Sequence, residues 1–304
     1  MTQTRDDQPA GPIVVGFEGG PSSDDALSLS SCLARGLGTR QLVVTVYPAP
    51  APIGPGRVDA EWVVERRRTA EDVLEGARQV VESLPTAAGD VDYLVLGSSS
   101  AAHGLHDMAE SESAEMIVVG SFGEGPSRRL FPGSTADRLL SGATCAVAVA
   151  PRGLRKHPER ELQRIGVAYI DTLDGRAALD AAARLAVRAG ATLTLYTAVP
   201  SRAEVPALLL AKDSDEAFVD RAEDTYESAL DEAMADLPSG IEATAQILPG
   251  SPVDVLAELD DDDVDLLVCG SRGYGPVRHV LLGGVSSRLV RRAASPVLVV
   301  PRSD

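Results

Sequence analysis

Lysine, cysteine and aromatic residues are scarce in this sequence of 304 residues. Its two lysines are Lys156 and Lys212, and aromatic side chains make up 4% of the chain. The three cysteines, Cys32, Cys145 and Cys269, do not suit a disulfide framework, so we expect small buried thiols in a reducing compartment. No apolar run approaches the roughly 18 residues of a membrane span, and the polar start MTQTRDDQPAG lacks the apolar core of a secretory signal. We therefore expect a soluble cytoplasmic protein.

Positive charge is also in deficit. Lysine and arginine together number 28 against 45 aspartates and glutamates, which gives a formal net charge of -17. Such a chain repels phosphate backbones and anionic headgroups, so we expect neither nucleic acid nor a membrane surface as a partner. The sequence contains no GKS or GKT, which excludes a Walker A nucleotide site.

The chain contains two copies of one glycine-rich stretch. GSFGEGPSRRLFPGST (120–135) returns as GSRGYGPVRHVLLGGVSS (270–287), and a gapless alignment extends through Pro-Arg at 151–152 and 301–302. This pattern indicates an internal duplication. The length suits two domains of roughly 150 residues. We predict a first domain over 1–151 with a disordered tail at 1–10, a linker over 152–161, and a second domain over 162–304.

Each half alternates apolar strands with amphipathic helices. The expected strands are 13–17, 41–47, 91–97, 116–120 and 147–150, and in the second half 165–170, 192–199, 242–248, 266–270 and 297–300. The expected long helices are 24–35, 60–84, 175–188 and 215–237; a short helix precedes each fourth strand, and a last helix begins near Ser134 or Val285. Ser22 with Asp25 is expected to begin the first helix, and Gly36 with Gly38 to end it. This order predicts an α/β fold with a parallel sheet, helices on both faces, and ligands at the carboxyl ends of the strands.

The glycine-rich stretch has the chemistry of an anion site. Its frame is Gly120, Gly123 and Gly133, followed by the hydroxyl of Ser134. Glycine lets a backbone approach a phosphate closely and adopts positive φ at little cost. The helix that follows offers unpaired amides and the positive end of its dipole. The alternative is that the glycines only make a tight turn, and the presence of the frame in both halves favours the anion site.

The frame follows a VVGS-type strand, and each half closes with Val-x-Pro-Arg; together these motifs resemble the universal stress protein family from Ile13 to Arg302. The resemblance implies two tandem domains. Each would be a Rossmann-like, adenine nucleotide alpha hydrolase-like sandwich with a five-stranded parallel sheet. It also implies that the last strands of the two halves, 147–150 and 297–300, pair with each other, and it leaves a homodimer open. Family members divide into those that bind ATP through this loop and those that do not.

Departures from the family pattern distinguish the two halves. Members that bind ATP usually carry an aspartate at the end of the first strand; here Glu18 keeps the charge in the first half, whereas the second has Ile170 at that position and Asp171 one residue late. A slip of one residue turns a side chain to the other face of a strand. Each half also lacks one hydroxyl at the end of the loop, where the first reads GSTA (133–136) and the second GGVS (283–286).

The resemblance therefore implies ATP, with or without Mg²⁺, as a ligand of the first domain more than of the second. Val46 and, on a weaker match, Thr197 occupy the place where the second strand of the family offers its backbone to the base. The implied cofactor-binding residues are Glu18, Val46, Gly120, Gly123, Gly133, Ser134 and Thr135, with Gly270, Gly273, Gly283 and Ser286 in the second domain. No catalytic residue and no metal ligand is assigned.

Two further clusters could suggest a metal. His103 and His106 with Asp107 are spaced for one face of a helix, but no distant third ligand is evident, and we favour solvated side chains. The run 260–263 with Asp265 (DDDDVD) lacks the spacing and central glycine of a calcium loop, so we expect a solvated turn.

Basic residues near the loops allow two interpretations. Arg128, Arg129 and Arg278 could neutralise phosphates or could be ordinary surface charges, and the same choice applies to His279.

Three functions are weighed on these residues. The leading hypothesis is a stress-response protein that binds ATP or a related adenine nucleotide as a regulatory ligand, with at most slow, incidental hydrolysis. The second is an interaction module of the same fold with both sites decayed. The third is an ATP-consuming ligase or hydrolase, because EGGPSS (18–23) is faintly similar to the S-G-G-x-D-S loop of such ligases; Glu18 and Ser22 depart from that pattern and make it the weakest.

Overall fold

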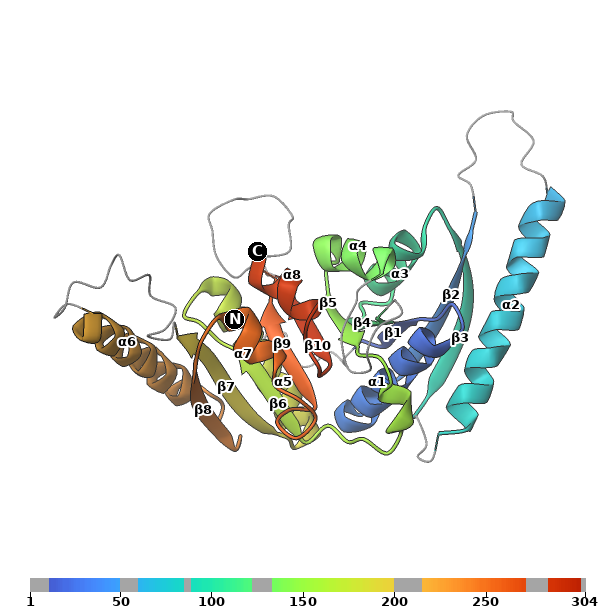
Figure 1. Ribbon diagram of the computed structural model, residues 1–304. Coiled ribbons are helices and arrows are strands. Elements are labelled where there is room, and N and C mark those ends of the chain that lie inside the picture. The colour runs from blue at the N-terminus through green and yellow to red at the C-terminus, as the bar shows by residue number, and fades with distance from the viewer. Residues whose placement is uncertain are drawn as a thin grey trace, which may run out of the picture.

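The computed structural model describes residues 11–49, 60–84, 89–121, 133–199, 215–271 and 284–301. The chain forms one ten-stranded sheet with the strand order β3-β2-β1-β4-β5-β10-β9-β6-β7-β8 (Figure 1). Within each half all neighbouring strands are parallel, and helices alternate with them along the chain. The α/β fold class predicted from the sequence is confirmed.

The first half contains five strands and four α-helices. Its elements are β1 (Ile13–Gly16), α1 (Pro21–Leu37), β2 (Gln41–Pro48), α2 (Ala60–Glu82), β3 (Val91–Ser98), α3 (Ala101–Ser111), β4 (Met116–Gly120), α4 (Ser134–Gly142) and β5 (Ala146–Ala150). The second half repeats this order as β6 (Arg164–Ala168), α5 (Leu173–Ala189), β7 (Thr192–Val199), α6 (Asp215–Ala235), β8 (Ala243–Pro249), α7 (Pro252–Ala257), β9 (Leu266–Gly270), α8 (Gly284–Val290) and β10 (Val297–Val300).

The start of α1 differs from the sequence-based prediction. The helix begins at Pro21 after Gly20, and no side chain caps it. Proline suits the first helical position because it has no N–H to leave unpaired there. The predicted start signal of Ser22 with Asp25 was therefore wrong, since Asp25 binds the linker instead. The predicted end is confirmed, because Gly38 caps the helix in the left-handed conformation at φ 62°.

Alternating side chains of each central strand pack into two separate cores, one on each face of the sheet. In β1, Ile13 and Val15 belong to the core to which α1, α2, α5 and α6 contribute, whereas Val14 belongs to the core to which α3, α4, α7 and α8 contribute. This alternation follows from the twofold period of a strand. Both clusters contain residues of both halves, so each face of the sheet is covered by a core that crosses the middle of the molecule.

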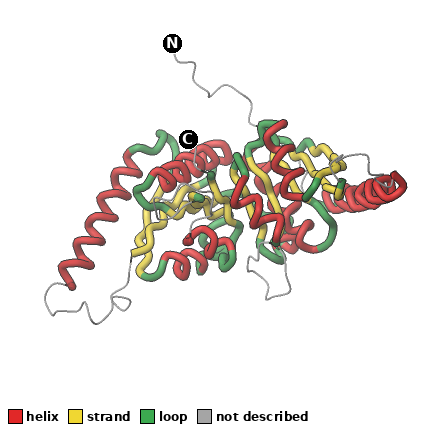
Figure 2. Tube along the Cα trace, turned by 90° about the horizontal axis from the view of Figure 1, so that it is seen from above, coloured by secondary structure: helices red, strands yellow, loops and turns green. Residues whose placement is uncertain are grey.

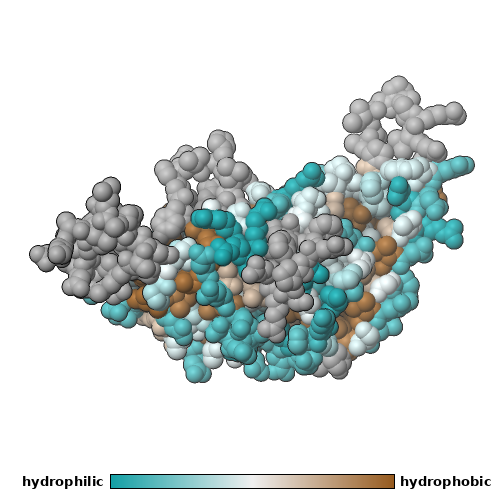
Figure 3. All heavy atoms as spheres, viewed as in Figure 1, coloured by the Kyte–Doolittle hydropathy of each residue, from teal (hydrophilic) through white to brown (hydrophobic). Residues whose placement is uncertain are grey.

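The two halves join at the centre of the sheet. There β5 and β10 pair antiparallel, with Val147 opposite Val299 and Val149 opposite Val297. Because β5 and β10 each lie at the edge of their own half, this pairing leaves β3 and β8 as the outer strands of the sheet among the described residues. In the view of Figure 3, hydrophilic residues cover most of the described surface and apolar residues form separate patches.

The segment between the halves is held by buried carboxylates. Asp25 is 1% exposed; it accepts hydrogen bonds from the backbone N–H groups of Gly153 and Arg155, each at 2.9 Å, and pairs with the Arg155 guanidinium at 3.1 Å. A 3₁₀ turn, Leu154–Lys156, packs on α1 at this point, and Leu154 and Leu162 belong to the core beneath α1.

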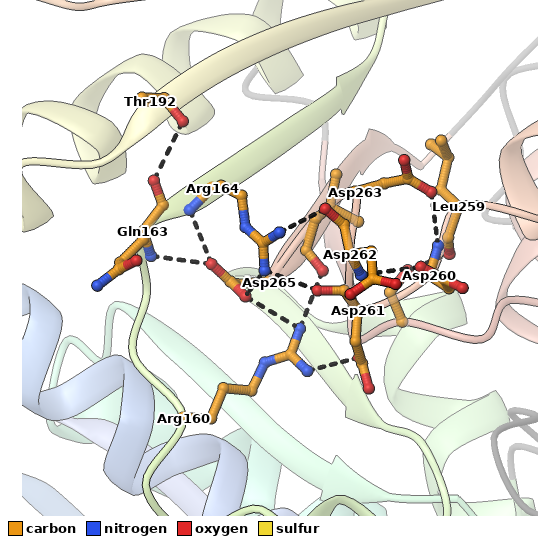
Figure 4. A network of polar contacts seen from close by, with 12 residues as sticks. Arg160, Gln163, Arg164, Thr192, Leu259, Asp260, Asp261, Asp262, Asp263 and Asp265 are labelled. Atoms are coloured by element: carbon orange, nitrogen blue, oxygen red, sulfur yellow. Dashed lines mark hydrogen bonds and ion pairs between the residues drawn. The ribbon is translucent and has the colours of Figure 1, made fainter.

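A second group of polar contacts fastens the end of this segment to the second half (Figure 4). Asp265 is 5% exposed and accepts the backbone N–H groups of Gln163 and Arg164 at 3.0 and 2.8 Å. Arg160 contacts both Asp261, at 2.5 Å, and Asp265, at 3.3 Å. The predicted solvated turn was therefore wrong for Asp265, since buried donors neutralise this carboxylate.

Within the described ranges, none of the helices combines the length and the apolar character that crossing a bilayer requires. The predicted tail at 1–10 lies outside these ranges.

Candidate nucleotide cavity

A cavity of about 240 Å³ opens at the carboxyl ends of β1, β2 and β4. The starts of α1, α3 and α4 complete its wall, through Ser22, Ala101 and Ser134. Since β1 lies between β2 and β4, the chain leaves the sheet in opposite directions on the two sides of this point. Open α/β sheets bind ligands at this switch of strand order.

The lining divides into an apolar and a polar part. The apolar part consists of Val44, Val46, Ala101 and Leu105. The polar part consists of the hydroxyl-bearing residues Ser22, Ser23, Ser134 and Thr135 and the exposed carboxylate of Glu18. Of the residues predicted for the first site, the structure brings Glu18, Val46, Gly120, Gly133, Ser134 and Thr135 together around this one cavity. Gly123 lies outside the described residues, as do Arg128 and Arg129.

A glycine turn after β1 sets the position of Glu18. Gly19 and Gly20 have φ values of 87° and 80°, which side chains with a Cβ rarely adopt. The Ser23 hydroxyl accepts the Glu18 N–H at 3.1 Å and donates to the Gly19 carbonyl at 3.2 Å. Gly19, Gly20 and Ser23, unlike Glu18, were not predicted as site residues; the signal was the stretch EGGPSS (18–23), which was weighed only as a ligase loop.

The start of α4 lines the cavity with its first turn. Gly133 precedes the helix, no side chain caps it, and Ser134, Thr135 and Ala136 form the first turn. The first N–H groups of a helix have no intrahelical acceptor, so they can bind an anion. Gly133 has φ -74°, a value that any residue adopts, so the expected need for positive φ does not apply at this glycine.

Gly120 has a packing role that the anion argument did not include. A Cβ at this position would lie 2.0 Å from the Ser22 carbonyl oxygen and 2.4 Å from its Oγ. The first turn of α1 therefore rests directly on the end of β4. Gly270 repeats the arrangement, where a Cβ would lie 2.7 Å from the Asp174 carbonyl oxygen.

The equivalent cavity of the second half is much smaller, at about 50 Å³. Gly270 and Ser286 line it, together with Ile170 in place of Glu18. Ser286 is buried and its hydroxyl donates to the Gly270 carbonyl at 2.6 Å, so this proton is already used within the protein. Gly273, Gly283, Arg278 and His279 lie outside the described residues.

Strand register explains the other departures of the second half. Gly16 pairs with Val44 and Ala168 with Tyr196, so the counterpart of Val46 is Ala198, which lines the second cavity. The assignment of Thr197 was therefore wrong by one residue; its buried hydroxyl donates to the Tyr169 carbonyl at 2.9 Å.

Asp171, one residue beyond the strand-end position, lies on the other side of the sheet. It lines a groove beside α5 and pairs with Arg176 at 2.7 Å, which lowers the pKa of this exposed carboxyl. The one-residue slip thus removes the charge from the second cavity.

The two histidines of α3 contact different carboxylates. His103 Nε2 lies 3.3 Å from Asp107, and His106 Nε2 lies 3.6 Å from Glu110. Each contact spans one turn of the helix, as is common for exposed helical pairs.

Comparison with known proteins gives the same family over both halves. The model of the universal stress protein family matches residues 10–151 and again 161–301. Universal stress protein Rv2319c of Mycobacterium tuberculosis (strain ATCC 25618 / H37Rv) is 30% identical over 298 residues, covering 95% of this chain and 99% of the relative. Universal stress protein Rv2005c of the same strain is 26% identical over 302 residues, covering 96% and 97%.

A solved structure shows the same arrangement of the backbone. The crystal structure of a universal stress protein from Archaeoglobus fulgidus DSM 4304 superposes with a TM-score of 0.67 at 20% identity, covering 96% of this chain and 98% of that one. At this identity the likeness concerns the fold.

Proposed function

Because the chain belongs to the universal stress protein family and carries two such domains, we propose that its first domain binds ATP or a related adenine nucleotide as a regulatory ligand. The observation that supports this most directly is the cavity of about 240 Å³ at the β1/β4 switch point, where the start of α4, which no side chain caps, meets an apolar wall. The second domain, with about 50 Å³ at the equivalent point, contributes little or no binding.

The chemistry of the lining suits the parts of a nucleotide. Val44, Val46 and Leu105 offer an apolar surface to a base, and the amides of Ser134 and Thr135 offer donors to phosphate oxygens. Glu18 is placed to approach the ribose hydroxyls or a magnesium ion carried by the phosphates.

The ionisable side chains of the cavity suit nucleotide binding without hydrolysis. Among the described lining residues, Glu18 is the one ionisable side chain, and no second acid or base stands beside it. Hydrolysis requires a positioned base or an activated water in addition to phosphate binding. A regulatory ligand, hydrolysed slowly at most, is therefore the better proposal.

The second candidate is an interaction module that holds no nucleotide. The cavity volume favours it, because ligand sites typically enclose about 300–1,000 Å³ and the described part of this one is smaller. Mass spectrometry of small molecules released from the purified protein separates the two. We expect an adenine nucleotide; a protein that carries none and whose melting temperature does not rise at millimolar ATP, ADP, AMP or cAMP would support the interaction module.

A matched pair of substitutions tests the site. Ser134 and Gly284 are equivalent first residues of α4 and α8, and both are exposed. An aspartate at either position favours the helix dipole, so neither substitution should unfold the protein. Ser134→Asp should weaken ATP binding by roughly tenfold or more through repulsion of the phosphates, whereas Gly284→Asp should leave it unchanged. Equal effects of the two substitutions in titration calorimetry would contradict the proposal.

A further inference from the structure

Two equivalent helices, α4 and α8, lie on the same face of the sheet on either side of the β5–β10 seam (Figure 1). Seen from above, helices lie on both sides of the strands in each half (Figure 2). The gapless alignment of the two halves makes Asp137 of α4 the counterpart of Ser287 in α8. The same alignment makes Ser141 of α4 the counterpart of Arg291, which follows α8. A contact between Asp137 and Arg291 therefore has no charged equivalent across the seam.

Such a contact joins α4 to the second domain. Nη2 of Arg291 donates to both carboxylate oxygens of Asp137, at 3.0 Å to Oδ1 and 3.2 Å to Oδ2. In the equivalent position of the first half, the Ser141 hydroxyl donates to the Asp137 carbonyl of its own helix at 2.8 Å. The second domain thus brings an arginine to α4, whereas the first domain brings none to α8 from the equivalent position.

Asp137 lies close to the proposed phosphate site. Ser134, Thr135 and Ala136 line the cavity, and Asp137 is the next residue of α4. Residues three apart on a helix are neighbours, with Cβ atoms about 5–6 Å apart, and helical side chains point back toward the N-terminus. The Asp137 carboxylate is therefore directed toward the end of α4 where Ser134 stands. Charges closer than about 10 Å are only partly screened by salt, so a free carboxylate here would repel a bound phosphate.

The exposure of the ion pair argues against a mainly structural role. The side chains of Arg291 and Asp137 are 51% and 41% exposed, and exposed ion pairs contribute little to stability. Their charges still act on an anion nearby. The formal net charge of -17 and the carboxylate of Glu18 in the cavity already oppose a polyanion. Pairing with Arg291 removes the repulsion from one further acid.

We propose that Arg291 of the second domain raises the affinity of the first domain for a triphosphate by neutralising Asp137 beside the start of α4. This inference rests on the proposed nucleotide site and deepens it, because it gives the second domain a part in a site that the first domain lines. Arg291 does not line the cavity, so it is a positioning residue that acts through Asp137.

Titration calorimetry of the full-length protein with ATP tests the proposal. Arg291→Gln should weaken ATP binding by at least about threefold at low salt, and the loss should shrink at high salt because mobile ions screen Asp137. Arg292→Gln is the matched control. It removes the next arginine along the chain, which is also exposed and whose partner Asp254 belongs to the second domain, and it should leave ATP binding unchanged. Circular dichroism and melting temperatures verify that all variants fold.

A double variant separates charge neutralisation from a tie that only holds the domains together. Asp137→Asn removes the acid that Arg291 neutralises, so Asp137→Asn combined with Arg291→Gln should bind ATP with wild-type affinity. A double variant that binds as weakly as Arg291→Gln overturns the proposal. Equal affinities of the wild type and Arg291→Gln overturn it as well, and both results leave nucleotide binding itself in place. A wild-type protein that binds no ATP contradicts the proposed function and overturns this inference with it.

Discussion

At the scale of single residues, burial decides the chemistry of groups that the sequence only counts. The three cysteines illustrate this. Desolvation raises the pKa of Cys32 and Cys145 to about 11 and that of Cys269 to about 12, so all three are neutral thiols near neutral pH. The thiolate is the reactive species, and a buried neutral thiol behaves as a small apolar side chain.

We therefore expect Cys32 and Cys269, which are buried, to resist thiol reagents in the native protein at pH 8, the half-buried Cys145 to react slowly, and the denatured protein to react at all three cysteines. The folded pKa values lie above the unfolded value of 9.0, so the unfolded chain loses these protons first as pH rises. By linkage, the stabilising contribution is complete below pH 9 and declines above it. Rapid labelling of more than one thiol per native molecule by a chromogenic disulfide at pH 8 would contradict the burial of Cys32 and Cys269.

At the scale of elements, Gly120 at the end of β4 allows this strand and α1 to lie in direct contact. Gly120 allows the first turn of α1 to rest on the end of β4, and the same turn supplies Ser22 and Ser23 to the cavity. Packing and site geometry therefore depend on one position. A glycine spacing that indicates phosphate binding can therefore arise in part because a helix must approach the end of a strand closely.

Gly120→Ala should lower the free energy of unfolding by about 3 kcal/mol or more, because its Cβ would lie 2.0 Å from a backbone oxygen that cannot move without shifting α1. Gly142→Ala, at the end of α4, is the control, since no atom lies within 4 Å of its added Cβ. There the substitution should be neutral or stabilise by up to about 1 kcal/mol. Urea titration of both variants measures the difference, and similar midpoints would contradict the packing argument.

At the scale of the whole molecule, contacts between the two domains predict one cooperative unit. Both cores cross the β5–β10 seam, and ties such as Arg188 to Glu115 at 2.6 Å and Arg291 to Asp137 at 3.0 Å join one half to the other. The linker is bound along α1 by Asp25. We expect a single calorimetric transition whose calorimetric and van't Hoff enthalpies agree.

Asp25→Ala should lower the free energy of unfolding by about 3 kcal/mol, because the buried N–H groups of Gly153 and Arg155 would lose their acceptor. Asp92→Ala removes an exposed partner of Arg40 and should cost less than about 1 kcal/mol. Calorimetry of both proteins measures the contrast. Two separate transitions in the wild type would contradict the shared core.

Much of the fold could be predicted from the sequence, because duplication, apolar strands and helix periodicity are local patterns. All ten strands were expected within a few residues of their observed bounds. The start of α1 was missed because Ser22 with Asp25 three residues on has the spacing of a helix start signal, and only the structure shows that Asp25 binds the distant N–H groups of Gly153 and Arg155. The pair Gly19 and Gly20 could be read in the sequence, but the turn that they form beside the cavity depends on the hydrogen bond from the Ser23 hydroxyl to the Gly19 carbonyl.

What the sequence by itself determined was the repeated strand and helix order, the glycine frame and the unequal charges at Glu18 and Ile170, since each is carried by neighbours along the chain. Only the tertiary structure decided that the first cavity is open and the second nearly closed, that the Ser286 hydroxyl is hydrogen-bonded to the Gly270 carbonyl, and that the linker packs on the end of α1. These features depend on contacts between residues far apart in sequence, and packing against distant elements sets the volume of a cavity and the partner of a buried hydroxyl.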